Sequence, residues 1–484
     1  MLNLDQPSLL ATASYIDGEW RRDSDKTVDV TNPATGELIA QIPHMGAVET
    51  EQAVLAAKQA MPSWSGKTAN ERSNILRRWY DLIMKNQEDL ARILTAEQGK
   101  TLAEARGEIA YGASYIEWFA EEAKRIDGDI LQPPSSNKRL LVIKQPVGVV
   151  ASITPWNFPN AMIARKVAPA LAAGCTFVGK PASETPLSAL ALCVLAEQAG
   201  IPAGVLNMVV GQSSREIGGV LTQHPDVRKL TFTGSTEVGK VLMQQCTTTC
   251  KKTSMELGGN APFIVFDDAD IDAAIEGAIA SKYRNSGQTC VCTNRLIVQS
   301  GIYDTFVEKL AAAVKEFTLG NGADEGVTHG PMVSAKAVKD VDAMVNDAIE
   351  KGATSLVGGK IGDQGACYYE PTILTNVTQD MRVFREEIFG PVAPVFKFDT
   401  EEEAVAMAND TEFGLAAYFY TKDLGRIFRV GEALEYGIVG INEGIISNAM
   451  APFGGIKESG SGREGSKYGI TDYLEIKYLC LGIS

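Results

Sequence analysis

Histidine is scarce in this chain. Its 484 residues include three histidines, His44, His224 and His329, and none lies at a spacing typical of metal ligands. Histidine-rich zinc sites and most cysteine–histidine proteases depend on this residue. The scarcity argues against both classes, and we expect no metal site.

Long apolar runs and an excess of positive charge are also missing. No uncharged apolar run approaches the ~18 residues needed to cross a bilayer, and residues 1–10 lack the basic and apolar regions of a signal peptide. The net charge of -15 argues against nucleic acid and anionic membranes as partners. An anionic ligand would therefore require a local cluster of Arg or Lys.

The eight cysteines are dispersed, and most lie among apolar or alanine-rich residues. This distribution is typical of reduced thiols in a cytoplasmic protein and not of a disulfide framework. At 484 residues the chain exceeds the usual size of one domain, so we expect two or three domains.

Strands and helices alternate regularly from residue 147, after a helical region at about 50–124. We predict strands at residues 149–154, 176–179, 205–210 and 229–233, and helices at 161–173, 187–199 and 236–246, with a short helix ending at 221. This alternation predicts a parallel sheet covered on both faces. Such sheets bind ligands at the carboxyl ends of their strands.

A second alternating region follows residue 256. We predict a strand at 262–266, a helix at 270–283 and a strand at 295–299, which indicates a second α/β domain. Two further segments, 140–144 and 473–481, alternate as strands do. The second of them either pairs with a partner subunit or closes a sheet within the chain.

Cys290 is a candidate nucleophile. It is flanked by small polar residues just before a predicted strand, in Asn-Ser-Gly-Gln-Thr-Cys-Val-Cys. A loop thiol can attack an electrophile if its pKa is lowered. A buried, inert thiol is an equally open interpretation from the residues alone.

Glu256 and Asn157 stand beside turns. Glu256 precedes Leu257-Gly258-Gly259 and could activate water as a general base, although the pattern alone favours a surface Glu before a turn. Asn157 follows the first predicted strand of the alternating region and could donate its amide to a developing oxyanion. A turn rich in Pro and Asn is the ordinary alternative.

Two segments suggest a nucleotide. Lys180 closes a predicted strand and could bind a ribose hydroxyl or a phosphate. The segment Gly-Ser-Thr-Glu-Val-Gly at 234–239 links a strand to a helix, whose N-terminus could hold a pyrophosphate. Its glycine spacing is not that of the usual dinucleotide fingerprint, so the signal is weak.

Together these motifs resemble the aldehyde dehydrogenase superfamily over nearly the whole chain. The segments that carry the resemblance occur in family order: PWNFP, GKPAS, FTGSTEVG, ELGGN, GQTCVC, EEIFGP and PFGGIKESG. Stretches such as NDTEFGLAAYFY are most similar to the bacterial succinate-semialdehyde dehydrogenase branch. The implied α/β fold has a Rossmann-like parallel-sheet cofactor domain (1–127 and 147–256), a second α/β catalytic domain (257–456) and a small β oligomerisation arm with a C-terminal strand (128–146 and 457–484).

The resemblance also implies roles for individual residues. Cys290 matches the nucleophile, Glu256 the general base, and Asn157 the oxyanion donor together with the backbone N–H of Cys290. The implied cofactor, NADP or NAD, is bound by Thr154, Trp156, Lys180, Ser183, Gly211, Ser235, Leu257, Glu387 and Phe389. Ser183 stands where NAD-preferring relatives often carry Glu, so we expect NADP to be preferred, although Glu184 beside it adds opposing charge.

Arg165 and Arg284 bear on the substrate. An arginine is costly to bury without a partner. The two could bind a carboxylate together, or each could pair with a structural Asp or Glu, and their spacing leaves both possibilities open. The resemblance favours a carboxylate site that includes Ser447. It implies oxidation of succinate semialdehyde to succinate, with glutarate semialdehyde as the alternative substrate.

The resemblance raises three further expectations. Some relatives pair the nucleophile with a cysteine two positions on, so Cys292 is either the partner in a strained, reducible disulfide or a passive thiol. Glu443 stands where relatives tend to have a small residue, and in the substrate channel it would oppose an anion. Finally, the family implies a cytoplasmic homo-oligomer, a tetramer in preference to a dimer, that acts in GABA degradation.

Overall fold

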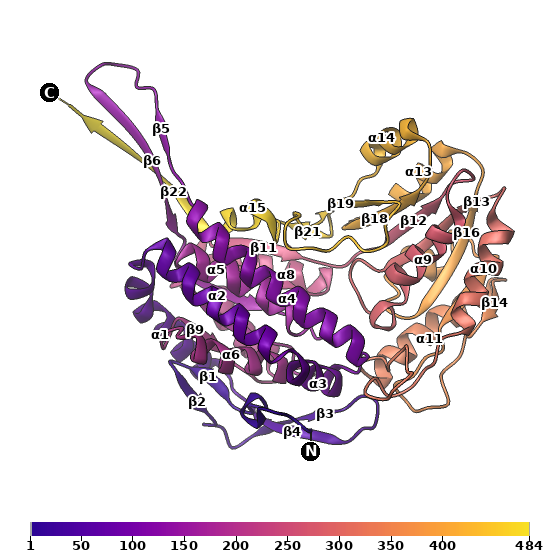
Figure 1. Cartoon of the computed structure of the whole chain (residues 1–484), viewed down its shortest axis with the longest axis horizontal. Helices are drawn as coiled ribbons and strands as arrows, with labels where there is room; N and C mark the ends of the chain where they lie inside the picture. Colours follow the sequence, from indigo (N-terminus) through magenta and orange to yellow (C-terminus); the bar gives the residue numbers. More distant parts are fainter. Residues whose placement is uncertain (1, 484) are drawn as a thin grey trace.

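Two large sheets, each covered by helices, organise the chain (Figure 1). The computed structural model describes residues 2–483. The first sheet has eight strands in the order β2-β1-β9-β8-β7-β10-β11-β21, and the second has seven in the order β14-β15-β16-β13-β12-β18-β19. Within the described residues, no helix is long and apolar enough to cross a membrane.

The first sheet is parallel at its centre and antiparallel at its edges. Its strands are β1 (Ser14–Ile16), β2 (Glu19–Arg21), β7 (Val149–Ile153), β8 (Thr176–Lys180), β9 (Leu206–Met208), β10 (Val227–Thr233), β11 (Lys252–Glu256) and β21 (Gly460–Ser461). All five residues of β8 are buried, as is typical of a strand with helices on both faces. The predicted parallel sheet is confirmed.

Helices connect and cover these strands. Those of the alternating region are α5 (Ala161–Ala173), α6 (Leu187–Ala199), α7 (Ser214–Gln223) and α8 (Thr236–Cys246), and those before it are α1 (Ala47–Ser65), α2 (Ala69–Lys85), α3 (Gln87–Gln98) and α4 (Leu102–Glu122). The bounds of α5, α6 and α8 are those predicted. Thr101 begins α4 with a capping box, in which its hydroxyl accepts from the Glu104 N–H and the Glu104 carboxylate accepts from the Thr101 N–H.

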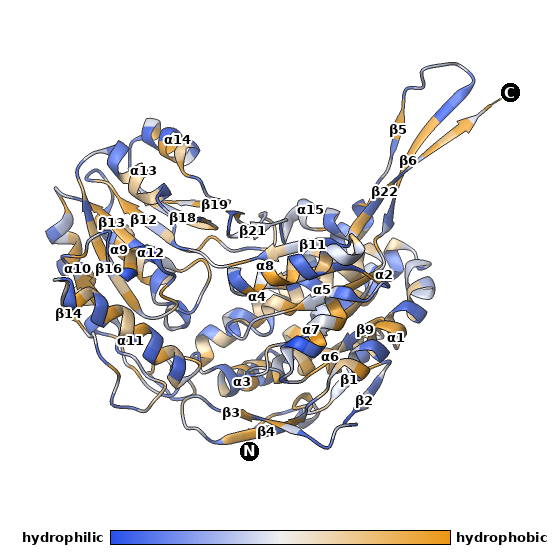
Figure 2. Cartoon of the chain, turned by 180° about the vertical axis from the view of Figure 1, so that it is seen from behind, coloured by the Kyte–Doolittle hydropathy of each residue, from blue (hydrophilic) through white to orange (hydrophobic). Residues whose placement is uncertain are grey.

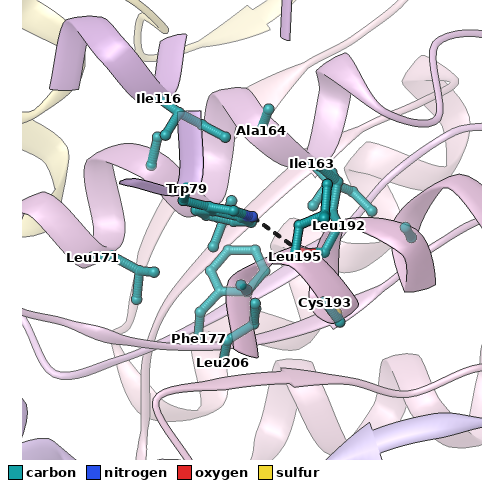
Figure 3. Close-up of a cluster of buried hydrophobic side chains, with 14 of the residues drawn as sticks. Trp79, Ile116, Ile163, Ala164, Leu171, Phe177, Leu192, Cys193, Leu195 and Leu206 are labelled. Atoms are coloured by element: carbon teal, nitrogen blue, oxygen red, sulfur yellow. Dashed lines mark hydrogen bonds between the residues drawn. The ribbon is translucent and has the colours of Figure 1, made fainter. Parts of the chain in front are cut away.

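A tryptophan ties two of these helices together. Trp79 of α2 is fully buried, and its Nε1 donates a 3.1 Å hydrogen bond to the Leu192 carbonyl in α6. Figure 3 shows Ile116, Leu171 and Phe177 around the same ring. The indole therefore contributes both apolar packing and a hydrogen bond to the layer on which α5 rests.

The second sheet is parallel except for β14 at its edge. Its strands are β12 (Ala261–Val265), β13 (Thr293–Gln299), β14 (Thr354–Val357), β15 (Thr372–Thr375), β16 (Val392–Phe398), β18 (Ala416–Tyr420) and β19 (Ile438–Ile441). Its helices are α9 (Ile271–Lys282), α10 (Tyr303–Lys315), α11 (Ala335–Glu350), α12 (Arg382–Arg385), α13 (Glu401–Asn409) and α14 (Leu424–Ala433).

Three antiparallel strands form an arm that projects from the first sheet's end of the molecule (Figures 1 and 2). They are β5 (Asp129–Leu131), β6 (Lys138–Pro146) and β22 (Leu474–Gly482), and β22 pairs with β6 along its whole length. The C-terminal strand thus closes a sheet within the chain. Several apolar side chains of the arm, including Ile130 and Ile476, are exposed.

Smaller elements complete the chain. They are the hairpin of β3 (Thr27–Thr31) and β4 (Leu38–Pro43), the pair β17 (Phe413–Gly414) and β20 (Ile456–Lys457), the helix α15 (Ser466–Gly469), and the 3₁₀ turns η1 (Pro7–Leu9), η2 (Ala123–Arg125), η3 (Thr247–Thr249), η4 (Arg284–Gly287) and η5 (Thr471–Tyr473). Sequence patterns did not predict the four N-terminal strands, β1 to β4.

The contact between α2 and α6 yields a stability prediction. Trp79→Ala should lower the free energy of unfolding by about 3–5 kcal/mol because it leaves a cavity. Trp79→Phe keeps most of the ring and should cost about 1–2 kcal/mol, largely through the lost hydrogen bond. Urea unfolding followed by far-UV circular dichroism measures both, with Trp20→Ala on the half-buried strand β2 as control. Equal midpoints for Trp79→Ala and the control would contradict the assigned role.

Candidate active site

Two cavities meet at Cys290. The larger, of about 620 Å³, lies at the carboxyl ends of β7, β8 and β10. The smaller, of about 290 Å³, lies between α4, α5 and residues 445–453, which follow β19. Cys290 and Met162 belong to the walls of both. A ligand in either cavity can therefore approach the thiol from its own side.

A strained turn presents Cys290. Asn285, Ser286 and Gly287 have φ values of 52°, 53° and 74°, in the left-handed region that non-glycine residues rarely adopt. The Asn285 N–H donates to Glu104 Oε1 at 2.6 Å, and Ser286 Oγ donates to the Gly330 carbonyl at 2.8 Å. These contacts from distant segments hold the turn in place just before β13.

The Cys290 thiol is not acidified by the residues around it. Burial, opposed by Arg165 and Arg284 and reinforced by Glu387 and Glu256, raises its pKa to about 12. The surrounding residues therefore do not lower the thiol pKa, which was the condition that the sequence pattern set for a nucleophile. Attack by this sulfur requires a base that removes its proton as the substrate binds.

Glu256 is the last residue of β11 and is 3% exposed, so the prediction of a surface Glu is wrong. Neither of its carboxyl oxygens has a hydrogen-bond partner among the described residues. Burial, reinforced by the Glu464 carboxylate and opposed by Arg165, raises the pKa of Glu256 well above its usual range. A buried, unpartnered carboxyl with a raised pKa is suited to act as a proton acceptor.

Asn157 lies between β7 and α5 and faces the turn that carries Cys290. Its Nδ2 donates to the Gln288 carbonyl at 3.0 Å. The backbone carbonyl of Asn157 accepts from Lys100 Nζ at 2.9 Å and from Asn285 Nδ2 at 3.1 Å. Among the described residues the side-chain amide donates only the hydrogen bond to Gln288, so the protein does not engage its second N–H.

The larger cavity brings together most of the predicted cofactor residues. Its wall includes Thr154, Trp156, Lys180, Ser183, Ser235, Leu257, Glu387 and Phe389. Gly211 lies behind the wall, where its carbonyl accepts a hydrogen bond from Ser183 Oγ at 3.1 Å. Sequence patterns missed Thr233, which ends β10 at the same edge of the sheet and also lines the cavity.

The polar groups of this cavity fit a dinucleotide. Thr154 Oγ1 and Thr233 Oγ1 are buried and have no hydrogen-bond partner in residues 2–483. Ser235 caps the N-terminus of α8, a position suited to a pyrophosphate. The Glu387 carboxylate accepts from the Gly259 N–H at 3.2 Å, and burial raises its pKa to about 7. Hydroxyls, a helix N-terminus and a carboxylate are groups that bind ribose and phosphate.

Two aromatic rings border the same cavity near its inner end. Trp156 and Phe389 meet edge to face, with centroids 5.5 Å apart. Phe389 has a φ of 49°, an uncommon conformation for a bulky residue. The strain places this ring against Trp156 at the wall that leads toward Cys290.

The smaller cavity unites Arg165, Arg284 and Ser447 with Cys290. Arg165 Nε lies 2.6 Å from Glu464 Oε2, so this arginine both pairs with a structural carboxylate and lines the cavity. Arg284 has no carboxylate within 4.0 Å among the described residues, and its Nε has no hydrogen-bond partner there. Its guanidinium therefore has donors to spare.

Neither Glu443 nor Cys292 lines either cavity. The Glu443 carboxylate is exposed and accepts from the Ile445 N–H at 2.8 Å, so it shapes the loop that carries Ser447 and is not part of either wall. Cys292 is buried, and its Sγ donates to the Lys282 carbonyl at 2.9 Å. Both Cys290 and Cys292 are free thiols in this structure.

Other buried charged residues around the site had no signal in the sequence. Lys100 and Glu108 line the smaller cavity, and Glu464 pairs with both Arg165 and Lys166. Each lies in a segment whose sequence pattern is typical of an ordinary helix or turn and does not indicate a functional role. Only the fold reveals their proximity to Cys290.

Comparison with known proteins agrees with this geometry. The family model described as "Aldehyde dehydrogenase family" matches residues 20–479. The chain is 62% identical to a 3-sulfolactaldehyde dehydrogenase of Pseudomonas putida (100% of this chain and 99% of the relative), and 62% identical to a glutarate-semialdehyde dehydrogenase of Pseudomonas aeruginosa (99% and 100%). It is 60% identical to the NADP(+) succinate-semialdehyde dehydrogenase of Escherichia coli, with both chains covered completely.

Solved structures show the same fold. The crystal structure of an Escherichia coli NADP-dependent enzyme, 60% identical in sequence, superposes with a TM-score of 0.98 over 99% of this chain and 100% of that one. A match over nearly the full length, in both sequence and structure, shows that the chain belongs to the aldehyde dehydrogenase family.

Proposed function

We propose that this chain oxidises succinate semialdehyde to succinate, with NADP⁺ or NAD⁺ as the oxidant. The observation that carries the choice of substrate is the guanidinium of Arg284, which has no carboxylate within 4.0 Å among residues 2–483 and shares the smaller cavity with Arg165, Ser447 and the Cys290 thiol. An arginine with free donors in a half-buried cavity favours a planar carboxylate. We infer that the substrate carboxylate binds at this guanidinium while the aldehyde meets the Cys290 sulfur in the same cavity.

The names of the three relatives support an anionic aldehyde. Succinate semialdehyde, glutarate semialdehyde and 3-sulfolactaldehyde each carry an acidic group besides the aldehyde. Their similar identities to this chain do not separate the three substrates. Glutarate semialdehyde, one methylene longer than succinate semialdehyde, is the second candidate because the same clamp would hold its carboxylate.

We propose the following roles for the catalytic residues. As the sulfur attacks the aldehyde carbon, the Cys290 proton passes to solvent water in the cavity. The resulting thiohemiacetal oxyanion accepts hydrogen bonds from the Asn157 amide and the Cys290 N–H. A bound nicotinamide supplies the acceptor for the hydride that the carbonyl carbon must lose. Glu256 then takes a proton from the water that hydrolyses the Cys290 thioester, which releases the carboxylic acid and restores the thiol.

The proposed division of labour follows the two sheets. Residues 1–127 and 147–256 would hold most of the cofactor, and residues 257–456 would carry the nucleophile and half of the lining of the smaller cavity. Residues 128–146 and 457–484 would form the oligomerisation arm and C-terminal strand. The exposed apolar side chains of β5 and β22 support assembly through the arm, and we propose a homotetramer. Eight free cysteines support a reducing, cytoplasmic location.

NADP⁺ is the proposed preferred cofactor. Ser183 places no carboxylate in the wall, and the Lys180 ammonium in the same wall, which is buried, donates one hydrogen bond, to the Pro181 carbonyl at 3.2 Å. Lys180 therefore keeps donors for a ribose hydroxyl or a 2′-phosphate. Glu184 also lines the cavity and opposes this preference.

The carboxylate clamp predicts a selective loss of activity. Arg284→Ala should lower kcat/KM for succinate semialdehyde by about 10- to 100-fold, the value of a charge-assisted hydrogen bond. Butanal, of equal length but without the carboxylate, should react at the same rate with the variant and the parent. Steady-state NADPH formation measures both. A variant that slows equally on the two aldehydes would contradict the clamp.

The general base predicts a pH dependence. Because the pKa of Glu256 is raised, this residue is protonated at low pH, and the steady rate should increase as pH rises through that pKa. Glu256→Gln should abolish this dependence, lower the steady rate by about 100- to 10,000-fold, and leave a rapid initial burst of NADPH. Stopped-flow absorbance at 340 nm separates burst from steady rate. A lost burst would place Glu256 in the attack step and not in hydrolysis.

The cofactor wall predicts a shift in preference. Ser183→Glu should lower kcat/KM for NADP⁺ by about tenfold or more, because its carboxylate repels a 2′-phosphate. The value for NAD⁺ should change little, and Ser183→Ala serves as the size control. The ratio of the two kcat/KM values, measured at saturating aldehyde, is the readout. An unchanged ratio in Ser183→Glu would show that the 2′ position lies elsewhere.

A further inference from the structure

A buried ion pair lies behind the oxyanion loop. We propose that Lys100 and Glu108 form a positioning device that fixes Asn157 relative to Cys290, an inference that rests on the proposed function. The two residues belong to the α3–α4 junction and to α4, far in sequence from both reacting groups. Neither is part of the proposed chemistry.

Lys100 holds the backbone of the oxyanion donor. Its side chain is fully buried, and its Nζ lies 2.7 Å from Glu108 Oε2. The same Nζ donates to the Asn157 carbonyl at 2.9 Å and lies 3.8 Å from the centre of the Phe158 ring. The ammonium thus contacts the two residues on which the direction of the Asn157 side chain depends.

Glu108 holds the other end of the same loop. Its Oε1 accepts from the backbone N–H groups of Asn160 at 2.9 Å and Ala161 at 3.2 Å. These groups open α5, whose own N-cap residue makes no side-chain cap. The carboxylate therefore substitutes for a cap and is stabilised by the helix dipole. The ion pair clamps residues 157–161 at both ends.

Hydrogen bonds also connect the Lys100–Glu108 pair to the turn at residues 285–287, just before Cys290. Gln98 Oε1 accepts from the Lys100 N–H, and Gln98 Nε2 donates to Asn285 Oδ1, both at 3.0 Å. Asn285 Nδ2 in turn donates to the Asn157 carbonyl. The Asn157 carbonyl is therefore shared by a donor from the α3–α4 junction and a donor from the turn before Cys290. Displacement of Lys100 would move the amide relative to the sulfur.

Stability alone does not explain a charge pair at this position. Buried ion pairs are often matched or exceeded in stability by apolar residues of similar volume, since both charges must be desolvated. An ammonium, however, fixes a carbonyl by a directional, charge-assisted hydrogen bond that an apolar side chain cannot make. The expected signature is a loss of turnover that operates through Asn157.

A double-mutant cycle tests the proposal. The enzymes are the parent, Lys100→Met, Asn157→Ala and the double variant, assayed with succinate semialdehyde and NADP⁺. Loss of an oxyanion donor costs about 100- to 1,000-fold in kcat, and we expect that order for Asn157→Ala. Lys100→Met should lower kcat about 10- to 100-fold with little change in KM, and the double variant should be no slower than Asn157→Ala.

A second buried lysine provides the matched control. Lys229 is also fully buried and lies 4.0 Å from a carboxylate, that of Asp472, but it makes no contact with Asn157. Lys229→Met should share any loss of thermal stability, and its effect on kcat should simply add to that of Asn157→Ala. If Lys100→Met does not fold, Glu108→Gln replaces it in the cycle, with the same expected non-additivity.

The possible outcomes separate the two levels of inference. If Asn157→Ala is slow but its loss of kcat adds to the loss of kcat in Lys100→Met, the positioning role is overturned. The proposed function stays intact in that case. A loss in Lys100→Met that appears in KM alone would also overturn it. An Asn157→Ala enzyme with the parent's kcat would contradict the oxyanion role and the positioning role together.

Discussion

The thiol of Cys290 is enclosed by protein although a ligand can approach it from two cavities, and the remainder of the site depends on that enclosure. Desolvation raises the pKa of the sulfur and the pKa of Glu256, so both groups favour their protonated, neutral forms. A neutral thiol and a neutral acid are inert toward each other. In the proposed mechanism, the sulfur would become reactive as it loses its proton, and a bound aldehyde and the Asn157 amide would stabilise the negative charge that forms.

The cations around the enclosed site differ in whether they have a carboxylate partner. Glu464 is buried and pairs with Arg165 and Lys166, and Glu108 is buried and pairs with Lys100. Arg284 is the cation of the smaller cavity for which residues 2–483 provide no carboxylate within 4.0 Å. A substrate carboxylate would complete this pattern. In a chain with a net charge of -15, the proposed binding of an anion would depend on this local positive charge.

Sequence patterns predicted the features that depend on neighbouring residues, such as helix bounds and motifs at strand ends. The bounds of α5, α6 and α8 follow from apolar periodicity and from the polar residues that flank them. The motif residues around Cys290, Asn157 and Lys180 were recognisable because each follows or precedes a strand end. Lys100, Glu108 and Glu464 were not, since their partners lie up to 298 positions away. The burial of Glu256 was missed for the same reason: segments far along the chain cover it.

One of those segments links Glu256, the proposed general base, to the arm. β21 pairs with β11 at Glu256 and Gly460, and Gly460 adopts a φ of 121° where a Cβ would lie 1.9 Å from the Met255 carbonyl. Only glycine permits that approach. The same stretch supplies Glu464, whose charge raises the pKa of Glu256, and then continues into β22 of the arm. The residues that surround Glu256 and the C-terminal strand of the arm are therefore parts of one continuous segment.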